Sequence, residues 1–473
     1  MKGDCFTNRE QKDMSNLHTH DNKRSSFSGK LGYVLSAAGA SVGLGNIWRF
    51  PYLAAKYGGG IFLLIYILLA LTFGYTMIMA ESALGRMTRK STVGAFQAFG
   101  KAGWLSAGGW INAIIPVLIV PYYSVIGGWV IKYLIEYIRG NGKMLAADGY
   151  FSEFISDGVS TELCFILFCL FTLTIIYAGV RNGIERVSKF MMPILIVLSV
   201  LIAVYSVTRP GAMEGVKYFL VPNVKNFSWM TVVAAMGQMF YSLSIAMGIL
   251  ITFGSYMKKE TSLEDSTRNV EVFDTAIAIM AGLMIIPAVF SFSGGDPDTL
   301  QAGPALMFIT IPKVFENMGF GTVVGILFFL LVLFAAVTSS IALTESAVST
   351  FEDELGWSRR RATVLVGVIM IALGSLSSLG YGPLVGIKII GMQFLDFFDF
   401  LTNSVMMPIA AMLTSLFVSR IVGMKRMEEE IMHGESTFRR KKIFIVMIKY
   451  LCPVFALIIL ISSVANAFGW IAM

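Results

Sequence analysis

The chain has 473 residues, of which 56% are hydrophobic and only 14% are charged, and its mean hydropathy is +0.71. Soluble domains are about 45–50% apolar and about 25% charged, so this composition excludes a soluble globular protein and predicts one that lies mostly in a lipid bilayer. The net charge of +7 is then explained by basic cytoplasmic loops, and we expect no nucleic-acid partner.

The first 28 residues are polar, charged and rich in Ser and Asn. They contain no apolar run of signal-peptide length, so we expect no cleavable signal peptide, and the first membrane helix would direct insertion. We interpret 1–28 as a cytoplasmic polar leader that is disordered at least as far as Asn22.

The rest of the chain, 29–471, is predicted to be one all-α polytopic membrane domain. Apolar stretches of membrane length recur along it, and several exceed the roughly twenty residues that cross a bilayer, which predicts strong tilt or broken helices. A connection at 295–318 is expected to be an outer loop with a small hairpin. The eleven predicted spans lie near 33–55, 61–84, 107–138, 162–180, 187–207, 229–256, 271–294, 322–351, 362–379, 388–419 and 443–470.

Lys and Arg are distributed unevenly between the two sides of the predicted membrane. If the N-terminus is cytoplasmic, the cytoplasmic segments hold 27 of them and the outer connections hold 7. This bias predicts a cytoplasmic N-terminus, and an odd number of spans then places the C-terminus outside. We expect 425–442 to be an amphipathic cytoplasmic loop beside anionic lipid. The sequence leaves the oligomeric state open.

The first predicted span carries residues that a plain membrane anchor would not tolerate. Gly39, Gly43 and Gly45 fall within seven residues and weaken the helix. Asn46 and Arg49 are costly in hydrocarbon. The glycines alone favour a helix-packing face. Packing does not need an arginine, however, so the whole set predicts a helix that breaks at mid-membrane.

The sixth predicted span has a second polar interruption. Gln238, Ser242 and Ser244 cluster in its middle, between Gly237 and Gly248. Two broken helices five spans apart predict a five-plus-five inverted repeat, with the eleventh span outside it. In such repeats half-helix ends face an anionic group and bare carbonyls face a cation, which indicates a carrier of small solutes and ions.

Several short motifs make the family recognisable. The sequence from about Lys30 to its end resembles the neurotransmitter:sodium symporter family, in particular its bacterial amino-acid branch with eleven spans and the LeuT fold. The resemblance implies a transporter in the bacterial cytoplasmic membrane. The motifs that carry it are Gly43-Leu-Gly-Asn-Ile-Trp-Arg-Phe-Pro51, Tyr57-Gly-Gly-Gly60, Gly237-Gln238 with Ser242-Leu-Ser244, Thr338-Ser339-Ser340 and Glu352-Asp-Glu-Leu.

The resemblance also implies two Na⁺ sites, residue by residue. The first, Na1, would use the substrate carboxylate and Ser41, Asn46, Ser242 and Asp274. The second, Na2, would use Gly39, Val42, Ala335, Thr338 and Ser339. Hard cations prefer oxygen ligands, and these positions supply carbonyl, amide, hydroxyl and carboxylate oxygens. Without the resemblance, the two hydroxyls of the second site would also fit hydrogen bonds between helices.

The substrate pocket follows from the same resemblance. Gly43 stands where monoamine carriers of the family have an aspartate, so a zwitterion with its own carboxylate is the expected substrate. Tyr123 would meet that carboxylate, and the flexible Met247 would accommodate large side chains. We expect hydrophobic L-amino acids, with tyrosine, tryptophan or leucine first. The lining would consist of Ala40, Ser41, Gly43, Leu44, Gly45, Ile119, Tyr123, Tyr241, Ser242, Ser244, Met247, Ser339 and Leu343.

At position 274 this sequence has an aspartate where many animal relatives have asparagine. Those relatives bind chloride next to the positions that correspond to Tyr66, Gln238 and Ser242 here. A buried carboxylate in a span is costly, so it is expected to serve a function. We predict that Asp274 supplies the negative charge itself and that transport is independent of chloride. The absence of a hydroxyl at Ala278 agrees with this prediction.

Two gates are implied as well. On the outer side Arg49 would reach Asp399 above Tyr123 and Tyr241. On the inner side the implied gate residues are Arg24, Asp353 and Tyr256, with Phe27 as an aromatic plug. Arg24 fits equally well as one more cytoplasmic basic residue.

The function predicted is sodium-coupled symport of hydrophobic or aromatic L-amino acids by alternating access. A non-transporting amino-acid sensor on the same fold remains an alternative. An ion channel is disfavoured, because its pore would need continuous polar rings and the polar residues here gather at one depth. An enzyme is disfavoured too, since three histidines and four cysteines form no catalytic pattern.

Overall fold

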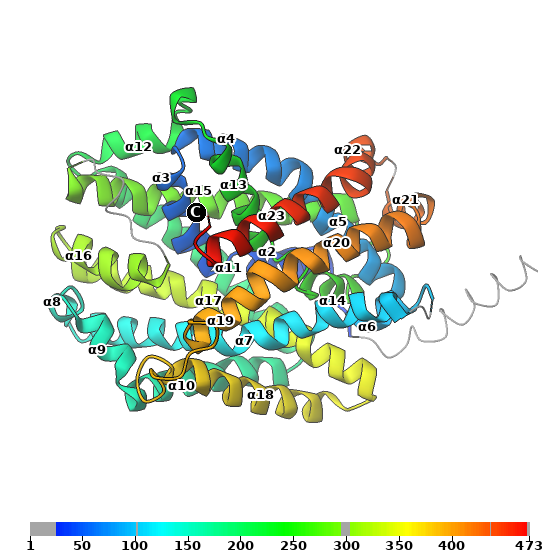
Figure 1. Ribbon diagram of the computed structural model, residues 1–473, viewed down its shortest axis with the longest axis horizontal. Coiled ribbons are helices and arrows are strands. Elements are labelled where there is room, and N and C mark those ends of the chain that lie inside the picture. The colour runs from blue at the N-terminus through cyan, green and yellow to red at the C-terminus, as the bar shows by residue number, and fades with distance from the viewer. Residues whose placement is uncertain (1–24, 101–102, 295–302, 436, 471–473) are drawn as a thin grey trace, which may run out of the picture.

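The computed structural model describes residues 25–100, 103–294, 303–435 and 437–470. Within these ranges the chain is almost entirely helical, and the isolated bridge between Ile389 and Met392 is its single β feature. Long helices lie alongside one another in one bundle, and short helices cap its two ends (Figure 1). The predicted all-α architecture is confirmed.

Nine helical stretches in the described part are long and apolar enough to cross a membrane. Single helices form five of them: α7 (Gly103–Ile138), α10 (Gly158–Tyr177), α15 (Leu263–Ser293), α17 (Gly321–Leu355) and α18 (Arg359–Leu379). The other four contain a π-helical turn: α4 (Gly60–Leu69), η2 (Ala70–Gly74) and α5 (Tyr75–Thr88); η3 (Val180–Glu185) and α11 (Arg186–Val207); α19 (Phe394–Asp399), η7 (Phe400–Met406), α20 (Met407–Phe417) and η8 (Val418–Val422); α22 (Lys441–Val446), η9 (Met447–Leu451) and α23 (Cys452–Ala467).

The first and sixth predicted spans are broken, as expected. The first consists of α2 (Lys30–Ser41), η1 (Gly45–Arg49) and α3 (Phe50–Lys56). The sixth consists of α13 (Trp229–Ser242) and α14 (Ile249–Ser255). No half is long enough to cross a bilayer alone, because about twenty residues are needed. With the nine continuous stretches, the two broken ones match the eleven predicted spans in chain order.

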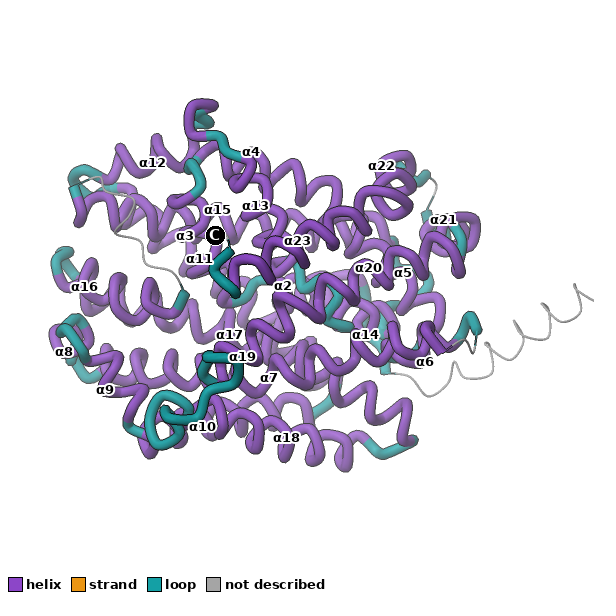
Figure 2. Tube along the Cα trace, in the orientation of Figure 1, coloured by secondary structure: helices purple, strands orange, loops and turns teal. Residues whose placement is uncertain are grey.

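Short helices distinguish the two ends of the bundle (Figure 1). We call one the α9 end; it carries α8 (Gly142–Leu145), α9 (Tyr150–Ser156), α12 (Ala212–Leu220), η4 (Val224–Asn226), η6 (Leu306–Thr310) and α16 (Ile311–Glu316). We call the other the α21 end; it carries α6 (Thr92–Gln97) and α21 (Met424–Ile431). The loops gather mostly at these ends (Figure 2).

In the 295–318 connection the structure describes one continuous helical stretch, in which η6 runs directly into α16; residues 295–302 of the predicted hairpin lie outside the described residues. One boundary differs from the sequence prediction. The tenth span begins at Phe394 and not near 388, because the chain turns at Gly391, whose φ is +79°. A left-handed residue interrupts the helix before it starts.

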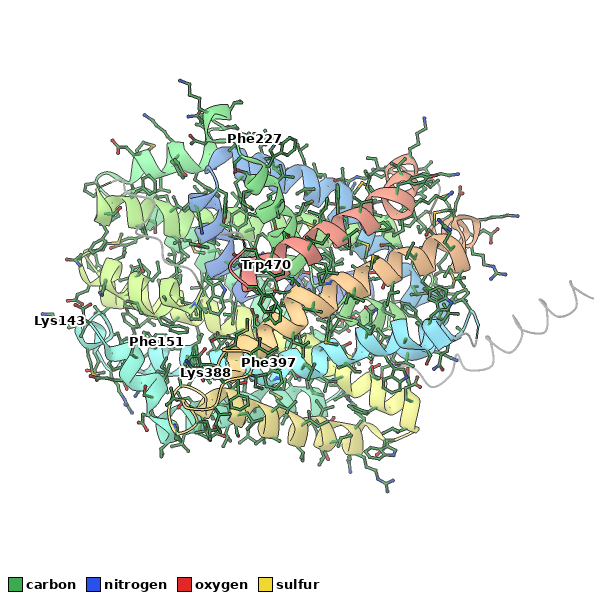
Figure 3. All side chains as sticks on the ribbon, in the orientation of Figure 1. Lys143, Phe151, Phe227, Lys388, Phe397 and Trp470 are labelled. Atoms are coloured by element: carbon green, nitrogen blue, oxygen red, sulfur yellow. The ribbon has the colours of Figure 1, made fainter. Side chains whose placement is uncertain are left out.

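The 424–441 segment is docked on the bundle, which the sequence did not indicate. Met427 and Ile431 of α21 are fully buried, and the fully buried Arg86 guanidinium donates to Glu430 Oε1 at 2.6 Å. An amphipathic helix buries its apolar stripe against the nearest apolar surface, here the α21 end of α5. Side chains fill the space between the helices throughout (Figure 3).

Candidate functional site

The break in the first span brings bare backbone close to three other helices. Asn46 N–H reaches only the carbonyl of Gly43, at 3.1 Å. A Cβ on Gly43 would lie 2.7 Å from Ser339 Oγ and 3.1 Å from Tyr123 Oη. One on Gly45 would collide with the Tyr241 ring. A side chain at either position would have to displace these neighbouring side chains, so glycine allows them to approach the backbone closely.

The break in the sixth span is held in an unusual backbone conformation. Between α13 and α14, Ser244 and Ala246 have φ of +53° and +60°, which L-residues rarely adopt. The Ala246 N–H donates to the buried Glu81 Oε1 at 2.8 Å, and Ser244 Oγ donates to the Ala40 carbonyl at 3.1 Å. A side chain of α5 and the carbonyl of the other broken helix thus hold the segment open.

One cavity lies where the two breaks meet α7 and α17. Its volume is about 30 Å³, so its walls must separate to admit a molecule of amino-acid size. All thirteen residues predicted to line a substrate pocket line it, and Asn46 and Ile249 line it as well. The full set is Ala40, Ser41, Gly43, Leu44, Gly45, Asn46, Ile119, Tyr123, Tyr241, Ser242, Ser244, Met247, Ile249, Ser339 and Leu343.

A first group of oxygen atoms surrounds the fully buried Asp274 of α15; we call it the Asp274 cluster. Asn46 Nδ2 donates to Asp274 Oδ1 at 2.9 Å, and Ser242 Oγ lies 3.0 Å from both carboxylate oxygens. Tyr66 Oη donates to Oδ2 at 3.2 Å. Two of the four predicted Na1 residues, Asn46 and Ser242, therefore contact a third, Asp274. The fourth, Ser41, lies on the adjoining cavity wall.

A second group of oxygen atoms lies between α2 and α17. Ser339 Oγ is 3.4 Å from the carbonyl oxygens of Gly39 and Val42. Thr338 Oγ1 lies 3.1 Å from the Ala335 carbonyl. The structure thus brings the five predicted Na2 residues into one neighbourhood, with carbonyl and hydroxyl oxygens only. Such a donor set suits a hard cation.

Aromatic side chains seal the cavity toward the α21 end. Phe27 is 1% exposed and Tyr256 is 2% exposed, and their ring centroids are 6.0 Å apart. Phe27 also packs edge-on against Phe253 at 5.6 Å. The Tyr256 hydroxyl donates to Glu345 Oε1 at 2.7 Å. Phe27 therefore packs among aromatic rings of α14 and its end, and its role as a plug stays a prediction.

The ionic part of the predicted inner gate lies partly outside the described residues, since Arg24 belongs to the undescribed 1–24. Asp353 Oδ2 accepts from the Ser91 N–H at 2.6 Å. A neighbouring ion pair joins Arg359 to Glu345, at 2.5 and 3.0 Å. The motifs did not reveal Glu345, because it lies among several polar residues of α17 and has no characteristic spacing to its partner.

The seal toward the α9 end is thinner. Arg49 and Tyr241 are half-buried and Asp399 is exposed. The Arg49 guanidinium lies over the Tyr241 ring, 5.1 Å from its centroid, and Asp399 accepts from Asn403 Nδ2 at 2.6 Å. In the described part of the chain Arg49 and Asp399 form no ion pair within 4.0 Å. The outer gate between Arg49 and Asp399 therefore stays a prediction.

Glu81 is the site residue that sequence reasoning missed most clearly. It lies inside the second span with no motif around it, and it is fully buried. A single buried carboxylate in an apolar helix was the available signal, because such residues are rare and costly. Its partner, a backbone N–H, leaves no trace in the sequence.

Comparisons with known proteins agree with this geometry. A model of the sodium:neurotransmitter symporter family matches residues 24–145 and 151–469. A sodium-dependent transporter of Bacillus subtilis, YhdH, is 34% identical over 414 residues, 87% of this chain and 91% of that protein. A sodium-dependent transporter of Haemophilus influenzae is 32% identical over 461 residues, 94% of this chain and 100% of that protein.

A more distant relative and a solved structure extend the comparison. The human sodium- and chloride-dependent GABA transporter 2 is 27% identical over 470 residues, 86% of this chain and 75% of that protein. The crystal structure of MhsT in complex with L-phenylalanine superposes with a TM-score of 0.83 at 35% identity, over 93% of this chain and 100% of that one.

Proposed function

Because the chain belongs to the sodium:neurotransmitter symporter family, we propose that it carries hydrophobic L-amino acids, aromatic ones included, together with Na⁺. Membership of this family makes the protein a multi-pass, sodium-dependent membrane transporter. The proposal concerns the class of substrate. The proposal rests on the cavity at the two helix breaks, which is lined by apolar side chains and by the glycines Gly43 and Gly45.

The chemistry of the cavity favours a zwitterion with an apolar side chain. Ile119, Met247 and Leu343 provide an apolar wall. The Leu44 N–H donates to Tyr123 Oη at 3.3 Å, and a substrate carboxylate that replaced this contact would accept from both groups. Gly43 offers no negative charge for a lone amine. The similarity to MhsT, solved with L-phenylalanine, supports an aromatic substrate.

We assign the coupling ions to the two oxygen groups. The Asp274 cluster would hold one Na⁺ together with the Ser41 carbonyl and the substrate carboxylate, and the Thr338–Ser339 group would hold another. Since substrate and first ion share a ligand shell, each would raise the affinity for the other. Asp274 would provide the anionic charge of the site, which makes transport independent of chloride.

Transport would proceed by alternating access. The α21 end would be cytoplasmic, in line with the excess of Lys and Arg predicted there, and its aromatic seal would open after the lid of Tyr241 and Arg49 has closed. Ion pairs that break and reform in such a cycle are modest in energy when partly exposed. The membrane would be the bacterial cytoplasmic membrane.

Uptake into proteoliposomes tests the proposal. Radiolabelled tyrosine, tryptophan and leucine would be offered with an inward Na⁺ gradient against K⁺, and accumulation should require Na⁺ and collapse when the gradient is dissipated. Sodium-dependent binding without flux would identify a sensor. Binding of small polar amino acids in preference to all three would overturn the substrate class.

A further inference from the structure

Arg440 reaches from the connection between the tenth and eleventh spans into the membrane bundle. It stands at the start of α22, and its Nη1 lies 3.2 and 3.0 Å from the two carboxylate oxygens of Glu271. Glu271 is 1% exposed. A buried carboxylate needs such a partner, because an unpaired charge inside a protein is strongly destabilising.

Glu271 is linked to the functional site through its own helix. It precedes Asp274 by three residues in α15, so the two carboxylates lie on the same helix face, one turn apart. A contact that fixes Glu271 therefore fixes how far α15 is rotated about its axis. That rotation decides whether Asp274 meets Asn46 and Ser242.

Arg440 also contacts the second span, which carries Tyr66, another residue of the Asp274 cluster. Its guanidinium lies over the Tyr75 ring, 4.5 Å from the centroid, and Nη1 is 3.4 Å from the Leu71 carbonyl. Tyr66 of the same span bonds Asp274 Oδ2. Leu71 belongs to the π-helical turn η2, which covers 70–74 and separates Tyr66 from Tyr75 along the span. π-turns shift the register of a helix locally and often occur at functional sites.

We propose that Arg440 is a positioning residue for the Asp274 cluster. Holding Glu271 on one side and the Tyr75 ring on the other, it sets the spacing and rotation of the second and seventh spans, so that Tyr66 and Asp274 meet in the geometry that binds Na⁺. The inference rests on the proposed function, because it names a residue that tunes the first of the two proposed Na⁺ sites.

Anchoring of the loop alone does not account for these contacts. The loop already docks through α21, where Arg86 holds Glu430 and Met427 is fully buried. Arg440 adds contacts to the second and seventh spans, and both of these spans carry residues of the Asp274 cluster. Its neighbour Lys441 instead pairs with Glu428 of the same loop.

The experiment compares Na⁺ affinity with substrate affinity in the purified full-length protein. Binding of radiolabelled tyrosine, tryptophan and leucine is measured for the wild type, and the tightest ligand is used throughout. The variants are Arg440→Gln, Glu271→Gln, the double neutral pair, and the control Lys441→Gln, which removes the adjacent charge in the same loop. Thermal unfolding of each variant reports its stability.

The expected result is a rise of about three- to thirty-fold in the Na⁺ concentration for half-maximal binding in Arg440→Gln. The Kd for the amino acid at saturating Na⁺ should change less than threefold, and Lys441→Gln should match the wild type. If Arg440→Gln does not fold, the double neutral pair, which leaves no unpaired charge, decides by the same criterion.

Two results would overturn the inference. The first would be that Arg440→Gln, or the double neutral pair, needs the same Na⁺ concentration for half-maximal binding as Lys441→Gln. The other is a parallel loss of Na⁺ and amino-acid affinity together with lower thermal stability, which would reduce Arg440 to a structural contact. Wild-type protein that binds none of the amino acids would instead contradict the proposed function.

Discussion

At the scale of single residues, the site depends on where one negative charge lies. Asp274 is fully buried, and its described partners are the neutral groups of Asn46, Tyr66 and Ser242. A carboxylate without a cation costs several kcal/mol in such a place. Binding of Na⁺ would offset this cost, so the same charge that is unfavourable alone provides the affinity for the ion.

Replacement of Asp274 by asparagine tests this role. The amide keeps the size and one acceptor oxygen but loses the charge, so we expect Na⁺-driven uptake to fall about tenfold or more in chloride-free medium. Uptake by the variant should recover in part when chloride is supplied. The measurement is initial uptake in proteoliposomes with chloride or gluconate. If wild-type uptake were abolished when gluconate replaces chloride, the prediction of chloride-independent transport would be wrong.

The hydroxyl of Thr338 provides a second test at this scale. Thr338→Val keeps the shape and removes an oxygen from the proposed second site, so the Na⁺ concentration for half-maximal binding should rise about fivefold or more. Thr344→Val is the matched control, because Thr344 lies in the same helix and its hydroxyl bonds only the Ser340 carbonyl among described partners. Equal shifts in the two variants would refute the assignment.

At the scale of elements, the two broken helices depend on supports from their neighbours. Residues with positive φ, such as Ser244 and Ala246, are strained and persist only where the surroundings hold them. Glu81 supplies one support through the Ala246 N–H, and the neighbouring Ser82 bonds Tyr33 of the first span at 2.7 Å. Consecutive residues of α5 thus hold both broken helices.

Glu81 variants should separate its role as an acceptor from its charge. Glu81→Ala leaves the Ala246 N–H without a partner, so amino-acid affinity should fall about tenfold. Glu81→Gln keeps an acceptor oxygen and should stay within about threefold of the wild type. Glu162→Ala is the control, because Glu162 bonds Ser375 between α10 and α18, away from the cavity. Equilibrium binding at saturating Na⁺ is the measurement. A Gln variant as weak as the Ala variant would contradict this account.

At the scale of the whole molecule, the two ends of the bundle are closed unequally. Toward the α21 end the cavity is covered by Phe27, Phe253 and Tyr256, which are all nearly inaccessible. Toward the α9 end it is covered by the half-buried Tyr241 and Arg49. A thinner covering opens with fewer broken contacts, so we expect the α9 side to open first from this conformation.

Movement of charge through the whole bundle is also measurable. Under the proposed stoichiometry, two Na⁺ would enter with one zwitterion and carry net charge inward, and each elementary charge would gain about 2.3 kcal/mol per 100 mV. A potassium diffusion potential of about 100 mV, negative inside, should therefore raise the limiting accumulation ratio by about 50-fold per net charge. Steady-state accumulation with and without valinomycin measures it. An accumulation insensitive to the potential would contradict net charge transfer.

Much of this architecture is predictable from local sequence. Runs of apolar residues marked the spans, since a bilayer core needs about twenty of them in a row. Glycines next to Asn46 and Arg49 marked the first break. Motifs shared with the family predicted thirteen pocket residues, and all of them line one cavity. Their roles in binding stay predictions. The inner-gate residue Arg24 lies outside the described residues.

The set of helices, the two breaks and the chemical type of the site can be predicted from the amino-acid sequence, because they follow from local hydrophobicity, glycine and polar residues. Which distant groups meet is seen only in the folded chain: Glu81 contacts the Ala246 N–H, and Arg440 contacts Glu271. The docking of α21 belongs to the same class. The physical reason is that such contacts join a side chain to backbone or to a residue more than a hundred positions away, and neither partner carries a local pattern that identifies the other.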